Sequence, residues 1–414
     1  MAEDDMYGNK AKYERIIANL ESFVQKPSGT GKYCCKSPKN LKYFEQLIQH
    51  FEMQDLSFIR RLRVLQVLKL ITSVVEKDLV ECDRDDINKV VAFSHTTHLT
   101  AESKRDFIKD LKRLWRVLFP ERDHQGRVDE TLTPYAVRHL SRKVDRSKVK
   151  LRNDRLTQEQ FMNILNFFSQ DPQIQAYLML ALESLGRPQE ILYTKVKDYE
   201  FYDNWAKVWI REHGKEGPGF LQCIDAYPYV VEWYHKHPLK DKPEAFFFMK
   251  LGKRERFEQL KNTNINKRLK YACKELGIDK TVTCYSLKRN GVSFRRERGD
   301  TDMQIQHAAR WTSTKQLQVY DMTNQDDALR LELKKRGLGD SRAIPQQHTK
   351  VCLFCSHANG FTSDFCVNCK RPLDRKKVEE MAKMHEKMQH NEVLQRFERI
   401  ERLFETLLPT VAAQ

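Results

Sequence analysis

Residues 281–321 read TVTCYSLKRNGVSFRRERGDTDMQIQHAARWTSTKQLQVYD. A basic, helix-like block comes first, and a Trp-Thr-Ser-Thr segment then leads to a single tyrosine, Tyr320. A tyrosine is a poor nucleophile at neutral pH because its pKa is about 10. It becomes useful when cations hold an anionic electrophile beside it and a nearby group takes its proton. The stretch therefore suggests attack on a phosphodiester, although a solvated basic helix and a packed tyrosine would give the same pattern.

A second stretch, LGRPQEIL over residues 185–192, lies upstream and is followed by Lys195-Val-Lys-Asp198. Together the two stretches resemble the tyrosine recombinase (integrase) family, which includes phage integrases and Xer-type resolvases. The family's first motif contains an Arg-x-x-Glu-Ile/Leu pattern with an Asp eleven residues after the Arg. Arg187, Glu190 and Asp198 match it.

The family's second motif is His-x-Leu-Arg, followed by a His or Trp and then by the nucleophilic Tyr nine residues later. Tyr285 and Lys288 fall on the first and last positions of the tetrapeptide, and Trp311 and Tyr320 follow at the expected spacing. The resemblance implies strand exchange of DNA through a covalent 3′-phosphotyrosine at Tyr320, with no metal or ATP needed for the chemistry.

The resemblance also implies a role for each matched residue. Arg187 would stabilise charge on the non-bridging phosphate oxygens, because its planar fork binds such oxygens in pairs. Lys215, at the tip of a Gly-rich turn, would be the general acid for the leaving 5′-oxygen. Glu190 would orient the basic groups, and Trp311 would pack against the phosphate. Asp198 is more in keeping with a structural role.

Two positions depart from the family pattern. Tyr285 stands where the family has His, and it cannot titrate near neutrality as His does. Lys288 stands where the family has Arg, which keeps the charge but loses the fork. Another arginine of the same block is a candidate to supply the missing fork: Arg289, Arg295 or Arg296. The same three arginines are also candidate DNA contacts. Two functions stay open, an active site-specific recombinase and a DNA-binding protein of the same fold that has lost catalysis.

Composition is consistent with a nucleic-acid partner. The 414 residues carry a formal net charge of +16 and a pI near 9.3, which favours a polyanion. The sequence contains no run of about 18 apolar residues, as a membrane span requires. The polar, acidic start MAEDDMYGNK does not resemble a secretory signal. We therefore expect a cytoplasmic protein that binds double-stranded DNA.

We predict an α+β, predominantly helical fold with several domains. The expected parts are a disordered start (1–12), a helical DNA-clamping domain of the core-binding, SAM-like type (13–120), a basic linker (121–152), a catalytic domain (153–340), a zinc ribbon (350–374) and a C-terminal helix (375–408). Arg60 and Arg61, on a basic helix of the clamping domain, are candidate DNA contacts. The catalytic domain is expected to contain a three-stranded antiparallel sheet, with Asp203-Asn204 as its first turn. Gly186 is expected to end the helix before Arg187 and to allow a close approach of the chain at that point.

The tail contains a Cys352-x-x-Cys355 pair and a Cys366-x-x-Cys369 pair separated by ten residues. This spacing predicts a closed, four-thiolate zinc site with a structural role, and His357 is a spare donor. A zinc ribbon after the catalytic domain resembles an arrangement seen in archaeal integrases. This resemblance implies an archaeal source and a gene that lies on a mobile genetic element. The apolar stripe of residues 375–408 would pack on its own domain or pair with a second subunit, as a dimer or tetramer on DNA would require.

Overall fold

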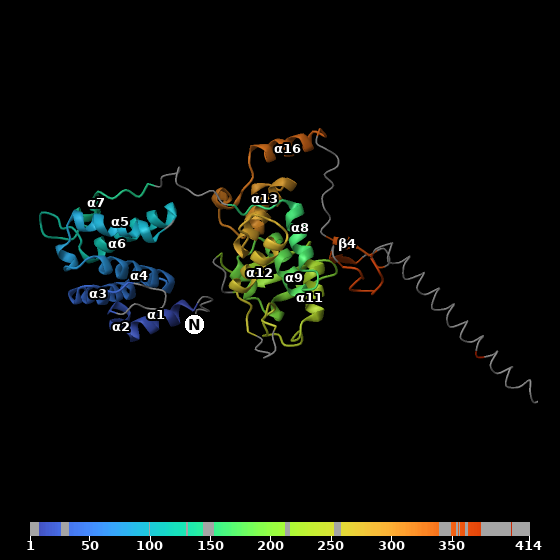
Figure 1. Cartoon of the computed structure of the whole chain (residues 1–414), viewed down its shortest axis with the longest axis horizontal. Helices are drawn as coiled ribbons and strands as arrows, with labels where there is room; N and C mark the ends of the chain where they lie inside the picture. Colours follow the sequence, from blue (N-terminus) through green and yellow to red (C-terminus); the bar gives the residue numbers. More distant parts are fainter. Residues whose placement is uncertain are drawn as a thin grey trace, which may run out of the picture. The chain divides into compact units, whose positions relative to one another are not determined.

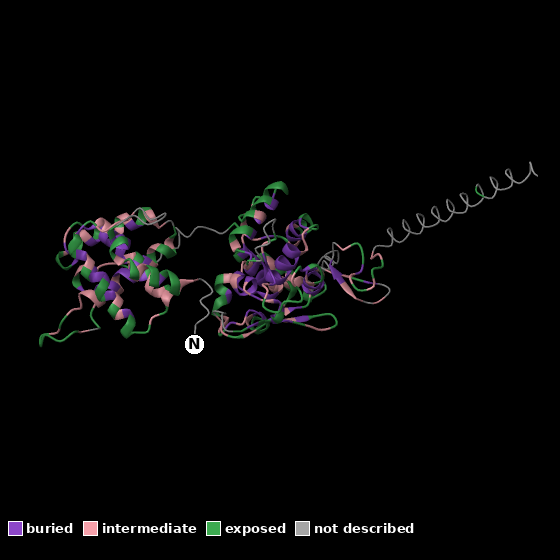
Figure 2. Cartoon of the chain, turned by 90° about the horizontal axis from the view of Figure 1, so that it is seen from below, coloured by how far each residue is buried: buried purple, intermediate pink, exposed green. Residues whose placement is uncertain are grey.

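The computed structural model describes residues 8–25, 33–98, 100–129, 131–143, 153–211, 216–251, 258–338, 349–352, 355, 357–360, 363–373 and 399. The chain divides into two compact units, Met1–Arg152 and Asn153–Gln414. Many of their helices are labelled in Figure 1, and Figure 2 shows that buried residues gather inside each unit. None of the described helices is both long and apolar enough to cross a membrane.

The labelled elements among the described residues of the first unit are all helices. Its elements are α1 (Asn9–Ala18), α2 (Leu20–Gln25), η1 (Pro38–Asn40), α3 (Leu41–Met53), α4 (Phe58–Val74), η2 (Leu79–Glu81), α5 (Arg84–Thr97), α6 (Ala101–Leu118) and α7 (Tyr135–Arg138). Apolar residues of α3 recur at helical spacing, and Phe44, Leu47 and Phe51 are all buried in the core of this unit. Thr100 begins α6, where its hydroxyl accepts a hydrogen bond from the Ser103 N–H at 3.1 Å. Val137, from the polar stretch expected to be a linker, is also buried in this core.

The second unit combines helices with two small sheets. Its elements are α8 (Gln158–Phe167), α9 (Pro172–Ser184), α10 (Pro188–Leu192), η4 (Val196–Asp198), β1 (Tyr199–Phe201), β2 (Ala206–Ile210), β3 (Gly219–Cys223), α11 (Tyr227–Lys236), α12 (Asn262–Glu275), α13 (Cys284–Arg298), α14 (Asp302–Ala308), η5 (Thr314–Gln316), α15 (Leu317–Tyr320), α16 (Gln325–Lys335), β4 (Thr349–Val351) and β5 (Ala358–Gly360). The predicted mixed, mainly helical fold is confirmed for these residues.

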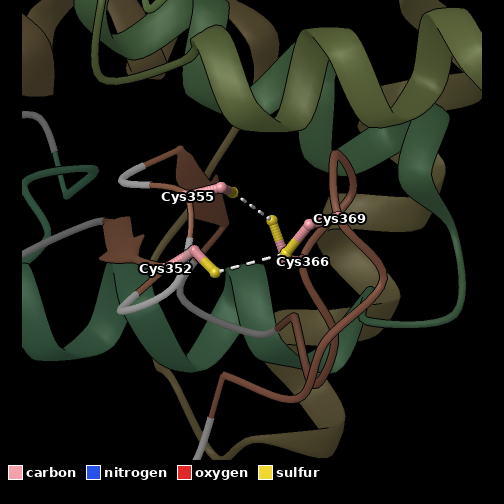
Figure 3. A group of neighbouring side chains, drawn as sticks. All are labelled: Cys352, Cys355, Cys366 and Cys369. Atoms are coloured by element: carbon pink, nitrogen blue, oxygen red, sulfur yellow. Dashed lines mark hydrogen bonds between the residues drawn. The ribbon is translucent and has the colours of Figure 1, made fainter.

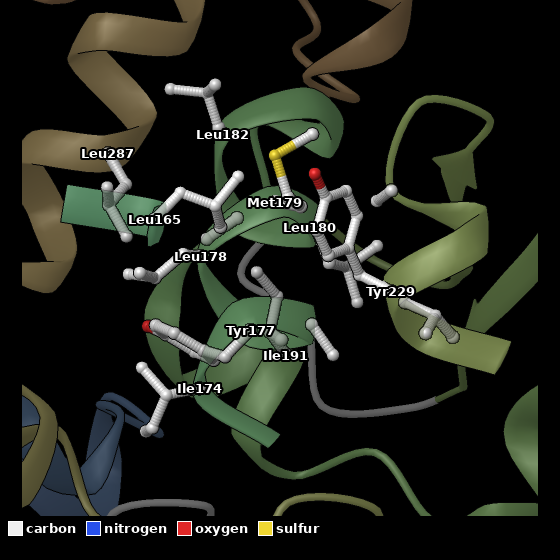
Figure 4. Packing of buried hydrophobic residues seen from close by; sticks show 14 of the residues in the cluster. Leu165, Ile174, Tyr177, Leu178, Met179, Leu180, Leu182, Ile191, Tyr229 and Leu287 are labelled. Atoms are coloured by element: carbon white, nitrogen blue, oxygen red, sulfur yellow. The ribbon is translucent and has the colours of Figure 1, made fainter. Parts of the chain in front are cut away.

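Helix α9 forms the centre of this unit, because nearly all of its residues are buried and most of them are apolar. Ile174, Tyr177 and Leu178 are completely buried, and Figure 4 shows them among side chains of α8, α10, α11 and α13. Helix α13 crosses α9 in backbone contact at Gly291. A Cβ atom at Gly291 would lie 2.1 Å from the Leu182 carbonyl oxygen, so only glycine permits this approach.

The predicted three-stranded antiparallel sheet is confirmed, in the order β1-β2-β3. Tyr199 pairs with Val208 on one side of β2, and Trp209 pairs with Phe220 on the other. Strand β2 ends at Ile210 and β3 begins at Gly219. The connection between them holds the Gly-rich turn of the sequence, of which residues 216–218 are described.

The second sheet, β4 paired with β5, packs against α11. A Cβ atom at Gly360 of β5 would lie only 2.9 Å from the Tyr229 ring of α11. The Ser363 hydroxyl lies 3.5 Å from a carboxylate oxygen of Glu232. This small sheet is therefore fixed to the larger body of the second unit through α11.

Candidate active site

Arg187 is held at the junction between α9 and α10. The chain leaves α9 at Leu185, which has the left-handed φ of 54°. The prediction that Gly186 ends this helix was therefore wrong by one residue. The predicted close approach at Gly186 is confirmed, because its Cβ would lie 3.0 Å from Leu221. The Arg187 N–H donates to Glu190 Oε2 at 3.0 Å, which fixes the start of α10.

The Arg187 guanidinium is buried between two carboxylates. Its Nη1 lies 3.6 Å from Glu190 Oε1, and its Nη2 forms an ion pair with Glu216. Burial works against the charge, but Glu216 and Glu190 outweigh it and raise the pKa of Arg187. Arg187 is therefore a permanent cation whose present partner on one side is a carboxylate from the β2–β3 connection.

Lys288, on α13, is buried in the same cluster and is only 1% exposed. Its Nζ lies 5.3 Å from the centre of the Trp311 ring and 5.2 Å from that of Tyr320. It has no hydrogen-bond partner among the described residues. Burial and the charge of Arg187 lower the pKa of Lys288 to about 8.

Tyr285, one turn before Lys288 on α13, is 41% exposed. Partial burial raises the pKa of its hydroxyl, and Arg187 acts against that rise.

Trp311 and Tyr320 lie against each other. Their rings are stacked, with centroids 5.2 Å apart and planes inclined by 30°. Trp311 is buried in a small apolar cluster that includes Val292 of α13 and Leu317 of α15, and Tyr320 packs on the edge of this cluster. The fold thus brings Arg187, Lys288, Trp311 and Tyr320 together from separate segments of the chain.

Other predicted site residues have different surroundings. Lys215 lies outside the described residues. Asp198 accepts hydrogen bonds from the Lys195 N–H at 2.8 Å and from Arg211 Nε at 2.9 Å, which fixes the start of η4. In the first unit, Arg60 forms an ion pair with buried Asp110 at 2.5 Å. Arg61 donates to the Leu56 carbonyl at 2.6 Å.

The three arginines considered as replacements for the fork each bind a carboxylate elsewhere. Arg289 pairs with Asp154. Arg295 pairs with Asp300 at 3.1 Å. Arg296 pairs with Asp321 at 3.2 Å and also with Asp302.

Two residues of the cluster were missed from the sequence. Arg310 lies with its Nη1 3.8 Å from Glu190 Oε2 and donates from Nη2 to the Gly217 carbonyl. Glu216 is the partner of Arg187. In the sequence, the only indication of a role for Arg310 is its position directly before Trp311. For Glu216 it is the position directly after Lys215. With Lys288, the cluster contains three basic and two acidic side chains, and it can bind an additional anion if one carboxylate moves away.

The four predicted zinc ligands form a separate cluster. Their sulfur atoms all lie within 4.8 Å of one another and face one another in Figure 3. The Cys352–Cys369 and Cys355–Cys366 sulfur pairs are each 3.6 Å apart. Four bonds of about 2.3 Å around a tetrahedral zinc ion place the sulfur atoms about 3.8 Å apart, so the geometry fits zinc. His357 is not part of this cluster.

Comparison with known proteins agrees with the fold. The model of the phage integrase family matches residues 154–327. A post-cleavage complex of the XerH site-specific recombinase with palindromic difH DNA is 13% identical, with a TM-score of 0.54 over 80% of this chain and 96% of that one. The Tn1549 transposon integrase bound to transposon right-end DNA is 13% identical, with a TM-score of 0.53 over 71% of this chain and 99% of that one.

A lambda integrase dimer bound to a COC′ core site is 15% identical, with a TM-score of 0.52 over 74% of this chain and 85% of that one. A comparison with curated proteins found no match. At these identities the solved structures establish a shared fold, whereas the family match rests on the sequence itself. The chain therefore carries a phage integrase family domain over residues 154–327.

Proposed function

We propose that this protein is a site-specific DNA recombinase that cuts and rejoins strands through a covalent 3′-phosphotyrosine at Tyr320. The observation that carries the proposal is that Arg187, Lys288 and Tyr320 lie in one cluster. Arg187 directly precedes α10, whereas Lys288 lies on α13 and Tyr320 on α15. Cations beside a tyrosine both attract a phosphodiester and favour the phenolate that attacks it.

In the proposed reaction, the Tyr320 phenol loses its proton and its oxygen bonds to the scissile phosphorus. The bond from phosphorus to the 5′-oxygen breaks, and that oxygen takes a proton and leaves as a 5′-hydroxyl. Lys215 is the proposed donor of that proton, as the family resemblance implies. Arg187 and Lys288 stabilise the charge on the non-bridging oxygens during the transfer. The phosphodiester energy is kept in the phosphotyrosine, so rejoining needs no ATP or metal.

The first unit is proposed to clamp the DNA, and the four-cysteine ribbon to hold a structural zinc ion. The resemblance of the ribbon to archaeal members stays a prediction. The solved structures of similar fold include a dimer of lambda integrase on a core site and a tetramer on a Holliday junction. We propose that this chain likewise assembles as a dimer or tetramer on its DNA.

A non-catalytic DNA-binding protein is the second candidate. The ion pair between Arg187 and Glu216 favours it, because a carboxylate uses the cation that the phosphate would need. Tyr285 and Lys288 favour it as well, since neither supplies the group that the family has at its position.

Covalent trapping tests the two candidates. The full chain is mixed with nicked DNA duplexes of random sequence, denatured in SDS and examined for a protein–DNA adduct. Tyr320→Phe should abolish the adduct, while Tyr271→Phe, a matched change at an exposed tyrosine of α12, should leave it unchanged. Tight DNA binding without any adduct would favour the non-catalytic candidate. An adduct that survives in Tyr320→Phe would exclude Tyr320 as the nucleophile.

A further inference from the structure

Arg310 adopts a backbone conformation that arginine rarely takes. Its φ is 58°, in the left-handed region that favours glycine. A strained conformation of this kind persists only where the surrounding structure imposes it, and such residues gather at functional sites. Arg310 directly precedes Trp311, so this conformation determines where the chain leaves α14 and enters the cluster.

The Arg310 side chain is buried without satisfying its donors. It is only 10% exposed, and its Nε and Nη1 have no hydrogen-bond partner among the described residues. A buried guanidinium whose N–H groups have no acceptor is energetically unfavourable. A bound anion removes this penalty when it accepts hydrogen bonds from those groups. Burial lowers the pKa of Arg310, and the nearby Arg187 adds to that effect.

Two guanidinium groups share one carboxylate in this cluster. Glu190 Oε1 lies 3.6 Å from Arg187 Nη1, and Glu190 Oε2 lies 3.8 Å from Arg310 Nη1. Both distances exceed those of a good charge-assisted hydrogen bond, which is about 2.8 Å. The shared carboxylate therefore lies beside one edge of each guanidinium group. Some N–H groups of each arginine stay available for another ligand.

We propose that Arg310 is the second guanidinium of the phosphate site and binds a non-bridging oxygen of the scissile phosphodiester together with Arg187. Lys288 supplies only a point charge at the position where the family has Arg, and Arg310 supplies the missing fork from a neighbouring segment. This inference rests on the proposed function for the identity of the anion, but not for the existence of the anion site.

A purely positioning role is the alternative. Arg310 donates to the Gly217 carbonyl, and its side chain lies against Gly219, whose Cβ would be 3.0 Å from Arg310 Nε. Arg310 could therefore hold the β2–β3 connection without touching the phosphate. The experiment must separate these two roles.

The first arm measures binding of tungstate, a stable phosphate-like anion, to the full chain by thermal shift. Arg310→Gly removes the guanidinium but suits the left-handed backbone, so it should melt no lower than the wild type. We expect it to need at least about tenfold more tungstate for the same shift, with Arg310→Lys intermediate. Arg268→Ala, which removes an arginine paired with Asp171, is the control and should behave as the wild type. Equal shifts in wild type and Arg310→Gly, or none in the wild type, would overturn the proposal.

The second arm uses a DNA site recovered by covalent trapping. Arg310→Gly should slow single-turnover cleavage about 100- to 1,000-fold, as loss of one oxyanion donor does. On a duplex with a neutral methylphosphonate at the scissile position, the loss should be much smaller, because the charged oxygen is absent. An equal loss on both substrates would mean that Arg310 only positions the loop. If the wild type forms no adduct, the proposed function fails, and the tungstate arm still decides whether Arg310 belongs to an anion site.

Discussion

The Nη2 atom of Arg187 forms a buried ion pair with Glu216, the sequence neighbour of Lys215. Because a phosphate must take the same cation, the carboxylate competes with the ligand that the site is proposed to bind. Glu216→Gln keeps the size of the side chain and removes its charge. We expect it to tighten tungstate binding about tenfold, equivalent to about 1.4 kcal/mol.

The control for this change is Glu244→Gln, which neutralises an exposed carboxylate paired with Lys195 and Lys197. It should leave the affinity for tungstate unchanged. Weaker binding in Glu216→Gln would instead mean that Glu216 supports the shape of the site.

Lys288 should destabilise the folded protein at neutral pH. Its pKa of about 8 lies below the ordinary value of 10.5 because of burial and the charge of Arg187. The unfolded state therefore holds the Lys288 proton more tightly than the folded state does. The buried charge lowers the free energy of unfolding by its full amount below pH 8, and this loss disappears as the pH rises to about 10.5. Lys288→Met should raise the free energy of unfolding by roughly 3 kcal/mol at pH 7, and it should also abolish DNA cleavage.

Urea denaturation at pH 7 and pH 10 tests this prediction. Lys274→Met, at an exposed position of α12, controls for the added methionine and should change little at either pH. If Lys288→Met raised the free energy of unfolding by the same amount at both pH values, the increase would come from apolar packing rather than from removal of the buried charge.

The four-cysteine cluster should bind one zinc ion per chain. Substituting cobalt should produce the visible absorption of a tetrahedral thiolate complex, and Cys352→Ser should lose it. Cys34→Ser, in the first unit, is the matched control and should retain the spectrum. Retention of a full four-thiolate spectrum in Cys352→Ser would show that the metal is held elsewhere.

Gly291→Ala should disrupt the crossing of α9 and α13. The added methyl group would lie 2.1 Å from the Leu182 carbonyl oxygen, and a backbone atom cannot move aside as a side chain can. We expect a loss of about 3 kcal/mol or more in the free energy of unfolding, measured by urea denaturation. Lys270→Ala, exposed on α12, should have little effect, and a similarly mild result for Gly291→Ala would show that the helices separate easily.

The sequence predicted the three-stranded sheet and the mainly helical architecture, because both depend on local patterns. It did not reveal Arg310, since the importance of that residue depends on a left-handed backbone and on the approach of residues 217–219 from another part of the chain. Glu216 was missed for the same reason. The role of its carboxylate depends on the β2–β3 hairpin, which places it beside Arg187.

Arg289, Arg295 and Arg296 illustrate the opposite error. All three stand close to Lys288 in the sequence, which suggested that one of them could replace the missing fork. On α13, however, each points toward an acidic residue outside the cluster. The direction in which a helical side chain leaves the backbone, rather than its distance along the sequence, decides which site it can serve.

The contact between Gly360 and Tyr229 has a practical consequence for dissecting this protein. The family match ends at residue 327, yet Tyr229 of α11 is buried beneath a strand that lies beyond this boundary, β5 (Ala358–Gly360). A shortened protein that stops at the family boundary would leave this aromatic surface bare and prone to self-association. A transplant of the domain into another protein should therefore extend at least through residue 373.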